Sequence, residues 1–288
     1  MSDKNPEYDF KWCPGCGDFS VRRALETAIE RRRIETELPV ENNVVVAGIG
    51  CSGNLIHLLE GNQPYGFHGI HGRSLPIAMG VKMGRPELNV LIVAGDGDFL
   101  GIGLEHIAPQ AARNLDVTAI IMDNAVYGLT KGQSSPTTLP GEVTPSTPYG
   151  KVEEAMNPLM LYLSMGVSFV ASAISTKVKD MSQMISDAMD HPGFSIVHVQ
   201  SPCTTYNDTY EQLKGNVKKG IEPTAWSIDD DHDPSDLDAA HKVVNSGGVP
   251  LGVIFRDTER PSFHSSVEEI GLKTQPKTAE RLLRRYAI

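Results

Sequence analysis

Residues 89–98 read NVLIVAGDGD, an apolar run that leads directly into two Gly-Asp pairs. A short continuous apolar run bounded by glycine is typical of a strand buried on both faces of a parallel sheet. Two similar runs flank it: residues 44–47 (VVVA) lead into GIGCSG, and residues 117–122 (VTAIIM) lead into Asp123 and Asn124. We therefore expect three parallel strands whose carboxyl ends place glycine, acid and amide groups at one edge of a sheet, where such folds bind ligands.

Helical periodicity fills the intervals between these strands. Residues 19–33, 75–83 and 103–113 read as helices, and a further helix is expected to begin near Leu55. Residues 158–166 and 177–189 read as helices and residues 167–171 and 194–199 as strands. The alternation predicts an α/β fold with a mostly parallel sheet and helices on both faces.

The composition becomes acidic and irregular after Pro223, with three consecutive aspartates at 229–231. One more strand is expected at residues 249–255 and a basic tail helix near residues 280–285. The chain is thus expected to form a main α/β domain over residues 1–222. Residues 223–288 are expected to be an extension that packs on this domain or on a partner.

The charge balance excludes several classes of partner. The 288 residues carry 36 acidic and 26 basic side chains, for a formal net charge of −10. A surface that follows nucleic-acid phosphates or anionic lipid needs clustered Lys and Arg, so neither partner is expected. No apolar run is long enough to span a bilayer, and the start, MSDKNPEYDF, lacks the features of a signal peptide, so a cytoplasmic location is expected.

The four cysteines suggest metal binding. Cys13 and Cys16 form a CxxC pair, whereas Cys51 and Cys203 stand alone after predicted strands. A reducing cytoplasm disfavours disulfides. Four converging thiolates suit an iron–sulfur cluster or an all-cysteine zinc site, and this spacing leaves both open, together with unconnected buried thiols. A noncatalytic, zinc-stabilised nucleotide-binding scaffold is therefore one alternative function.

The second candidate site is Gly95-Asp96-Gly97-Asp98 together with Asn124 at the end of the next strand. Asp96 and Asn124 can meet on one hard cation such as magnesium, with diphosphate oxygens and a backbone carbonyl as further ligands. The glycines allow the backbone to approach a diphosphate closely. A dinucleotide site is the competing interpretation, but no GxGxxG follows the first predicted strand in register.

Six segments in this order resemble a known family: WCPGCGD, GIGCSGN, HGIHGRSLPIAMG, GDGDFLGIG, DNAVYGLTKGQSSPTT and SPC. They look like the β subunit of the 2-oxoacid:ferredoxin oxidoreductases, which use thiamine diphosphate to make acyl-CoA. The likeness covers residues 9–215, and LGVIFRDTERPSF is similar to the closing segment of the family. It implies the thiamine-diphosphate-binding fold.

The resemblance also implies ligands. A [4Fe–4S] cluster would bind Cys13, Cys16, Cys51 and Cys203, and magnesium would bind Asp96, Asn124 and the carbonyl of Val126. The cofactor site implied by the resemblance consists of Ile49, Gly50, Cys51, Ser52, His71, Gly95, Asp96, Gly97, Asp98, Asn124, Val126, Gly128 and Leu129.

Three side chains are candidate catalytic residues. His71, in its HGR context, could donate a hydrogen bond to a diphosphate or a reacting carbonyl. Arg73 could pair with a substrate carboxylate or with an acid of a partner, and Lys131 could pair with a substrate carboxylate.

The implied reaction is the coenzyme A-dependent oxidative decarboxylation of a 2-oxoacid, or its reverse, with electrons passing through the cluster to ferredoxin. No second domain supplies the carboxylate that thiamine activation needs, so an α subunit is expected to bring it, in a heterodimer or a dimer of heterodimers. Because one cluster uses all four cysteines, the chain resembles the simpler two-subunit enzymes. 2-Oxoglutarate is therefore preferred to pyruvate or a broad 2-oxoacid range. A decarboxylase without redox function would leave the cysteines unexplained.

Overall fold

The computed structural model describes residues 10–274, 278–284 and 286. Its centre is an eight-stranded sheet with the order β2-β1-β3-β4-β8-β7-β10-β9. Neighbouring strands are parallel from β2 to β7, β10 is antiparallel to β7, and β9 is parallel to β10. These strands are β1 (Asn43–Ala47), β2 (Tyr65–His68), β3 (Asn89–Gly95), β4 (Val117–Asp123), β7 (Phe169–Ile174), β8 (Phe194–Gln200), β9 (Ala225–Ser227) and β10 (Val249–Arg256).

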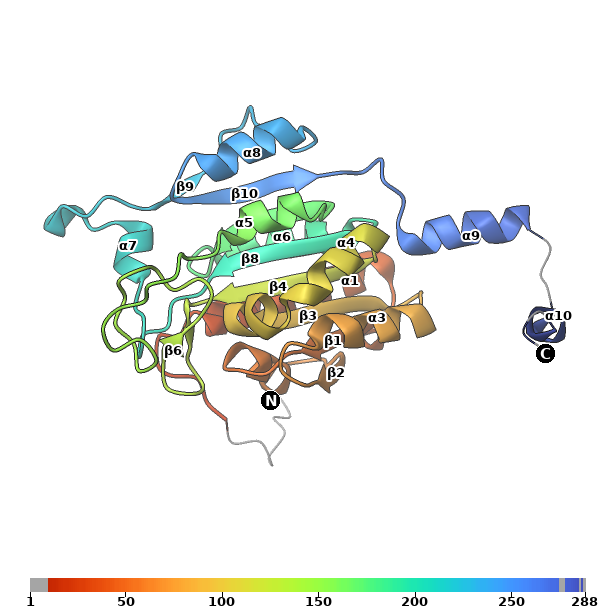
Figure 1. Ribbon diagram of the computed structural model, residues 1–288, viewed down its shortest axis with the longest axis horizontal. Helices are drawn as coiled ribbons and strands as arrows, with labels where there is room; N and C mark the ends of the chain where they lie inside the picture. The colour runs from red at the N-terminus through yellow and green to blue at the C-terminus, as the bar shows by residue number, and fades with distance from the viewer. Residues whose placement is uncertain (1–9, 275–277, 285, 287–288) are drawn as a thin grey trace.

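Helices cover both faces of this sheet (Figure 1). One buried cluster joins the sheet to α3, α4, α5 and α8, and a second joins the opposite face to α1, α2 and α6. The central strands are buried along their whole length because helices lie on both sides. The helices are α1 (Asp18–Thr36), α2 (Leu55–Leu58), α3 (Ser74–Gly84), α4 (Ile107–Arg113), α5 (Pro158–Ser164), α6 (Val178–Asp190), α7 (Tyr210–Lys214), α8 (Leu237–Asn245), α9 (Phe263–Lys273) and α10 (Ala279–Leu283).

The predicted fold class, a mostly parallel sheet between helices, is confirmed. The helix expected over residues 103–113 differs in detail. A π-helical turn, Gly97–Ile102, follows β3 directly, and a 3-10 turn, Leu104–His106, leads into α4 at Ile107. Gly103 faces backbone oxygens so closely that an added Cβ would lie 2.6 Å from the carbonyl oxygen of Asp98, which shows how tightly this wider turn packs.

Residues after 223 are more regular than their composition indicates. β10 extends the main sheet and α8 packs against it, while the aspartates at 229–231 lie in the connecting loop. Helices α9 and α10 project away from the body (Figure 1). The tail helix expected near residues 280–285 is α10, and Arg285 lies outside the described residues. Among the described residues, no helix is long and apolar enough to cross a membrane.

Candidate active site

A cavity of about 320 Å³ opens at the carboxyl edge of the parallel strands. It brings together all thirteen residues expected to bind the cofactor, from the end of β3 and the segments that follow β1, β2, β3 and β4. Tyr127 and Thr130, which were not expected from the sequence, also line it. The lining consists of Ile49, Gly50, Cys51, Ser52, His71, Gly95, Asp96, Gly97, Asp98, Asn124, Val126, Tyr127, Gly128, Leu129 and Thr130.

Two other cavities are larger but are lined by fewer of the predicted site residues. One of about 760 Å³ lies beside α1 and includes none of the predicted site residues. The other, of about 550 Å³, lies on the far side of Asn124 and Val126 and is bordered by the loop over residues 137–157. We therefore take the smaller cavity as the candidate site, because volume alone does not provide ligands.

Glycine at position 97 is required by the close approach of Tyr127. A Cβ on Gly97 would lie 2.2 Å from the Tyr127 ring, and the Tyr127 hydroxyl donates to the Gly97 carbonyl at 3.2 Å. The backbone after β3 is therefore locked against the loop after β4. This contact explains why the second glycine of this Gly-Asp-Gly turn cannot be replaced by a residue with a side chain.

His71 and Asp98 form an oriented pair at the cavity wall. Asp98 Oδ1 accepts from the backbone amides of Ile49 (3.0 Å) and Gly72 (2.8 Å) and lies 2.7 Å from His71 Nδ1. His71 Nδ1 also lies 3.2 Å from the Ile49 carbonyl oxygen, so both of its neighbours are acceptors and Nδ1 carries the hydrogen. The remaining ring nitrogen, Nε2, is therefore left for a ligand, as expected of a candidate catalytic group.

The pair is tightly enclosed. Burial raises the pKa of Asp98, although the two amides and His71 oppose that effect. Its Oδ2 is buried without a hydrogen-bond partner, and a Cβ on Gly48 would lie only 1.9 Å from this oxygen. Gly48 therefore has to be glycine, because the acid occupies the space that a side chain would fill.

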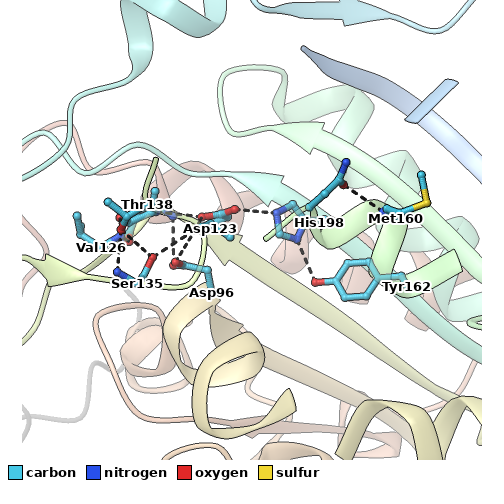
Figure 2. A network of polar contacts seen from close by, with 12 residues as sticks. Asp96, Asp123, Val126, Ser135, Thr138, Met160, Tyr162 and His198 are labelled. Carbon is cyan, nitrogen blue, oxygen red and sulfur yellow. Dashed lines mark hydrogen bonds and ion pairs between the residues drawn. The ribbon is translucent and has the colours of Figure 1, made fainter. Parts of the chain in front are cut away.

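Asp96 belongs to a buried polar network that extends away from the cavity (Figure 2). The Thr137 hydroxyl lies 2.8 Å from Asp96 Oδ2 and 2.8 Å from Asp123 Oδ1. His198 Nε2 lies 3.0 Å from Asp123 Oδ2, and the Tyr162 hydroxyl lies 3.2 Å from His198 Nδ1. His198 Nε2 donates to Asp123, because a carboxylate oxygen without a proton can only accept.

The two acids of the network differ in how readily they ionise. Thr137 has a single hydroxyl hydrogen for two carboxyl oxygens, so it can donate to only one of them at a time. Burial and then the charge of Asp123 raise the pKa of Asp96 to about 7. Burial would also raise the pKa of Asp123, but the hydrogen bond and charge of His198 outweigh it and lower that pKa. Asp96 is thus the more readily protonated of the two acids, and a cation bound there would favour its ionised form.

The donor set at this point suits a hard cation. Asp96, Asn124 and the backbone of Val126 all line the cavity, and the three groups offer oxygen atoms. The Asn124 side-chain oxygen accepts from the Val126 amide at 3.1 Å, which folds this loop into a tight turn. The residues present therefore fit magnesium and the diphosphate it would bridge.

Two of the cysteines, Cys51 and Cys203, meet beside the same cavity. A Cβ on Gly128 would lie 3.4 Å from the sulfur of Cys51 and 3.9 Å from that of Cys203. Cys13 is exposed, and the other three cysteines are partly buried. Among the described residues, no three His, Cys, Asp or Glu side chains are grouped so as to hold a metal ion.

A buried acid lies next to these thiols. Burial raises the pKa of Asp18 to about 6, against the opposing hydrogen bonds from Ser201 and Ser52. Burial, and then the Asp18 carboxylate, raises the pKa of the Cys51 thiol to about 12, and the same two causes raise the pKa of Cys16. Iron has to replace the protons of these thiols, and four thiolate donors fit an iron–sulfur cluster.

Two candidate catalytic side chains lie outside the cavity lining. Arg73 pairs with Glu105 at 3.2 Å and donates to the carbonyl oxygens of Gly72 and Ile102. Lys131 is exposed and has a positive φ of 87° in the loop that follows the cavity-lining Thr130. The structure therefore unites His71 with the cofactor residues but leaves Arg73 and Lys131 beyond the rim.

Fold and site together define a thiamine-diphosphate-binding domain. Residues 48–199 match the family described as "Thiamine pyrophosphate enzyme, C-terminal TPP binding domain". Residues 203–271 match a second family, the C-terminal part of the pyruvate ferredoxin oxidoreductase beta subunit. The second match begins at Cys203, so this family covers the strands and helices added after the main parallel sheet.

Relatives identify the family. Subunit beta of 2-oxoacid:ferredoxin oxidoreductase 1 from Aeropyrum pernix is 40% identical over 265 residues, which cover 90% of this chain and 81% of the relative. The 2-oxoglutarate synthase subunit KorB of Archaeoglobus fulgidus is 37% identical over 213 residues, or 72% of this chain and 77% of the relative. The chain belongs to the β subunits of the 2-oxoacid:ferredoxin oxidoreductases, as its motifs led us to expect.

A solved structure agrees with this assignment. A 2-oxoglutarate:ferredoxin oxidoreductase from Magnetococcus marinus, with 2-oxoglutarate, coenzyme A and succinyl-CoA bound, aligns with a TM-score of 0.85 at 33% identity. The alignment covers 98% of this chain and 94% of that one. The fold beyond residue 223 is therefore shared with the enzyme as well.

Sequence reasoning missed the second half of the polar network. His198 lies within the apolar strand β8, where a single histidine reads as a core residue. Thr137 lies in a Ser/Thr-rich loop with no distinguishing pattern. Only the fold shows that both side chains reach Asp123, so no local signal could have identified them.

Proposed function

We propose that this β subunit, together with an α subunit, catalyses the coenzyme A-dependent oxidative decarboxylation of 2-oxoglutarate to succinyl-CoA, or the reverse reductive carboxylation. The observation that carries the proposal is the position of Cys51, which lines the cofactor cavity while its sulfur converges with that of Cys203. A cluster on these thiols would touch the wall of the cavity. Electrons released there would have only a short distance to travel before leaving for ferredoxin.

Each group at the site has a role that its contacts support. Asp96, Asn124 and the Val126 carbonyl would hold magnesium, and Gly95 and Gly97 would let the diphosphate approach the backbone. Cys13, Cys16, Cys51 and Cys203 would hold the cluster. When bound, thiamine diphosphate supplies the electron sink for loss of carbon dioxide, and the cluster accepts the electrons.

His71 would act on the ligand from the cavity wall. Because Asp98 and the Ile49 carbonyl fix the hydrogen on Nδ1, Nε2 would be available to the ligand as an acceptor. The π-helical turn that contains Asp98 keeps the carboxylate in place behind the ring. The pair would therefore hold a proton at one defined nitrogen.

The preference for 2-oxoglutarate is supported by relatives and by the cysteine arrangement. The Magnetococcus marinus enzyme is named for this substrate, as are the KorB subunits. One cluster would use all four cysteines, which would leave none for an additional ferredoxin-like module. Other relatives are named only for 2-oxoacids, which makes pyruvate or a broad 2-oxoacid range the alternative.

An α subunit is part of this proposal. The carboxylate that activates thiamine would come from it, and residues 223–288 would serve as an extension of the 1–222 domain that packs on the domain or on this partner. The projecting helices α9 and α10 carry exposed apolar side chains that suit such a role, including Val267, Ile270 and Leu283.

The test is anaerobic purification with the α subunit, followed by iron, sulfide and thiamine-diphosphate analysis. Ferredoxin reduction is then compared with 2-oxoglutarate and with pyruvate, each with coenzyme A. We expect cluster iron, bound cofactor, faster reduction with 2-oxoglutarate, and no turnover by the isolated chain. Zinc without iron would refute the cluster, and faster reduction with pyruvate would refute the substrate assignment.

A further inference from the structure

The carboxylate of Asp18 is the buried charge closest in sequence to the cysteine pair, and it is not among the groups that the reaction above uses. It begins helix α1 and is 1% exposed. The Ser201 hydroxyl donates to it at 2.6 Å and the Ser52 hydroxyl at 3.2 Å. Within the described part of the chain it makes no ion pair, so its charge is balanced only by hydroxyl groups. An acid in such surroundings is costly to bury.

The two hydroxyls come from the two other cysteine-bearing segments. Ser52 directly follows Cys51, and Ser201 precedes Cys203 by two residues. Asp18 itself follows Cys16 by two residues. One carboxylate therefore connects all three segments that carry the thiols.

The geometry of these segments does not itself need a charge. The Trp12 indole donates to the Cys51 carbonyl at 2.8 Å, and the Gly17 amide donates to the Pro202 carbonyl at 3.1 Å. Two further hydroxyls, those of Thr204 and Tyr210, donate to carbonyl oxygens of the CxxC loop at 2.9 and 3.0 Å. Neutral hydrogen bonds already hold the segments together, so a neutral residue at position 18 would satisfy the same shape.

Backbone packing brings the acid to this point. A Cβ on Gly17 would lie 2.5 Å from Ser201 Oγ, so glycine is needed for the start of α1 to approach the loop after β8. The carboxylate is thus hydrogen-bonded to the residue that follows Cys51 and to the residue two positions before Cys203, so its charge lies close to the thiols.

The same carboxylate also adjoins the cofactor cavity. Ser52 lines that cavity, and its Oγ would lie 3.4 Å from a Cβ on Gly95. Asp18 is therefore one hydroxyl group away from the expected diphosphate site on one side and beside the thiols on the other. A charge in this position acts on the group that accepts electrons and is shielded from water.

We propose that Asp18, held by Ser52 and Ser201 between the three cysteine segments, places a negative charge beside the iron–sulfur cluster, which lowers its reduction potential. The inference rests on the proposed function, since it needs the cluster. A nearby negative charge disfavours the reduced cluster because reduction adds one more negative charge.

The experiment compares Asp18→Asn with wild type in the complex with the α subunit. Asparagine keeps the size of the side chain and can still hydrogen-bond to both serines, accepting from one and donating to the other, but it removes the charge. We expect cluster iron equal to wild type and a midpoint potential, measured by redox titration with electron paramagnetic resonance, that moves to a more positive value. Glu30→Gln is the matched control, because this acid lies on the same helix, is more exposed and pairs with Arg33, so its loss should leave the potential unchanged.

The outcomes are distinct. A full cluster with the wild-type potential in Asp18→Asn overturns the inference and leaves the proposed function intact. Wild-type complex without iron overturns both. If Asp18→Asn does not retain iron, Asp18→Ser decides, since serine is also neutral and can still form hydrogen bonds at this position. A potential above wild type then supports the inference, and an unchanged potential overturns it.

Discussion

Two buried polar networks lie at opposite ends of the parallel strands. We call the end where these strands begin the amino edge of the sheet and the end where they finish the carboxyl edge. At the amino edge, the Asn114 side chain accepts from the Ser168 hydroxyl at 2.6 Å and from the Phe194 amide at 3.0 Å, and Ser168 contacts His191 at 2.8 Å. At the carboxyl edge, Thr137 bridges Asp96 and Asp123. Both networks join neighbouring strands, but one is built from neutral groups and the other from two acids.

The difference separates groups that hold the fold from groups kept for a ligand. Neutral donors and acceptors can satisfy one another, so the amino-edge network can stabilise the protein. Two buried carboxyl groups that share one hydroxyl repel each other once both are ionised. The carboxyl-edge network is therefore most stable when a cation is bound. Substitutions at the two edges should therefore act on different observables.

The largest effect is expected for Asp96→Asn. Loss of this carboxylate should lower kcat/KM by about 1000-fold or more, because the cation would lose its charged ligand. The thermal midpoint of the cofactor-free protein should not fall, since the like-charge contact with Asp123 is removed. Activity assays and thiamine-diphosphate titration calorimetry with magnesium check this. Unaltered cofactor affinity would remove Asp96 from the metal site.

The amino edge is tested by Asn114→Ala. We expect a loss of about 3–5 kcal/mol in the free energy of unfolding, because several buried partners are left without hydrogen bonds. Asn114 also donates to the carbonyl oxygens of Arg260 and Pro261, so the segment before α9 should loosen. Urea unfolding measures this effect, while cofactor affinity below the transition should stay at the wild-type value.

Asn114→Gly is the matched control. Asn114 has a φ of 51°, a conformation that costs alanine energy but not glycine. The difference between the two variants isolates backbone strain from the lost hydrogen bonds. If Asn114→Gly were as stable as wild type, the network would not be what holds this edge.

A smaller effect is expected from pH at His191. Burial, and then the charge of Arg256, lowers the pKa of His191 to about 4 from an ordinary value of 6.5. The unfolded chain therefore takes up a proton as pH falls below 6.5, whereas the folded chain does so only near pH 4. Stability should decrease by about 2–3 kcal/mol across that window and then level off, as far as this group is concerned.

His191→Gln removes this titration and provides the control. The slope of unfolding free energy against pH should become shallower between pH 6.5 and 4 in that variant. Equal slopes in the two proteins would show that His191 is not kept neutral by the fold, and would weaken the description of the amino edge as an uncharged network.

The two edges also differ in how well the sequence predicts them. The sequence could predict the carboxyl edge because its groups stand at the ends of apolar runs: GDGD begins at the last residue of β3, Asp123 ends β4 and is followed by Asn124, and Cys51 lies in the loop after β1. The amino edge was not, since Asn114, Ser168 and His191 are single polar residues in ordinary loops. Their roles depend on which strands become neighbours, and β4, β8 and β7 are adjacent only in the folded sheet.

Prediction of secondary structure from the sequence failed where tertiary contacts determine the structure. The strand β2 (YGFH) was missed because it lies at the sheet edge, is largely exposed and has no apolar run. β9 is only three residues long and forms through pairing with β10. The start of α4 was placed too early because its periodicity continues through residues that the structure uses for a 3-10 turn, Leu104–His106.

The smallest effect is expected at the rim of the carboxyl edge, at Lys131. If this exposed lysine pairs with the distal carboxylate of 2-oxoglutarate, Lys131→Met should raise the KM for that substrate roughly fivefold, since water-screened ion pairs contribute about 1 kcal/mol or less. Pyruvate lacks a distal carboxylate, so its KM should not change, and kcat should be unaffected because the side chain does not line the cofactor cavity. Lys218→Met is the control for loss of an exposed lysine elsewhere. An unchanged 2-oxoglutarate KM would show that another cation pairs with the distal carboxylate. A lowered kcat would show that Lys131 takes part in the reaction itself, although it lies at the rim and does not line the cavity.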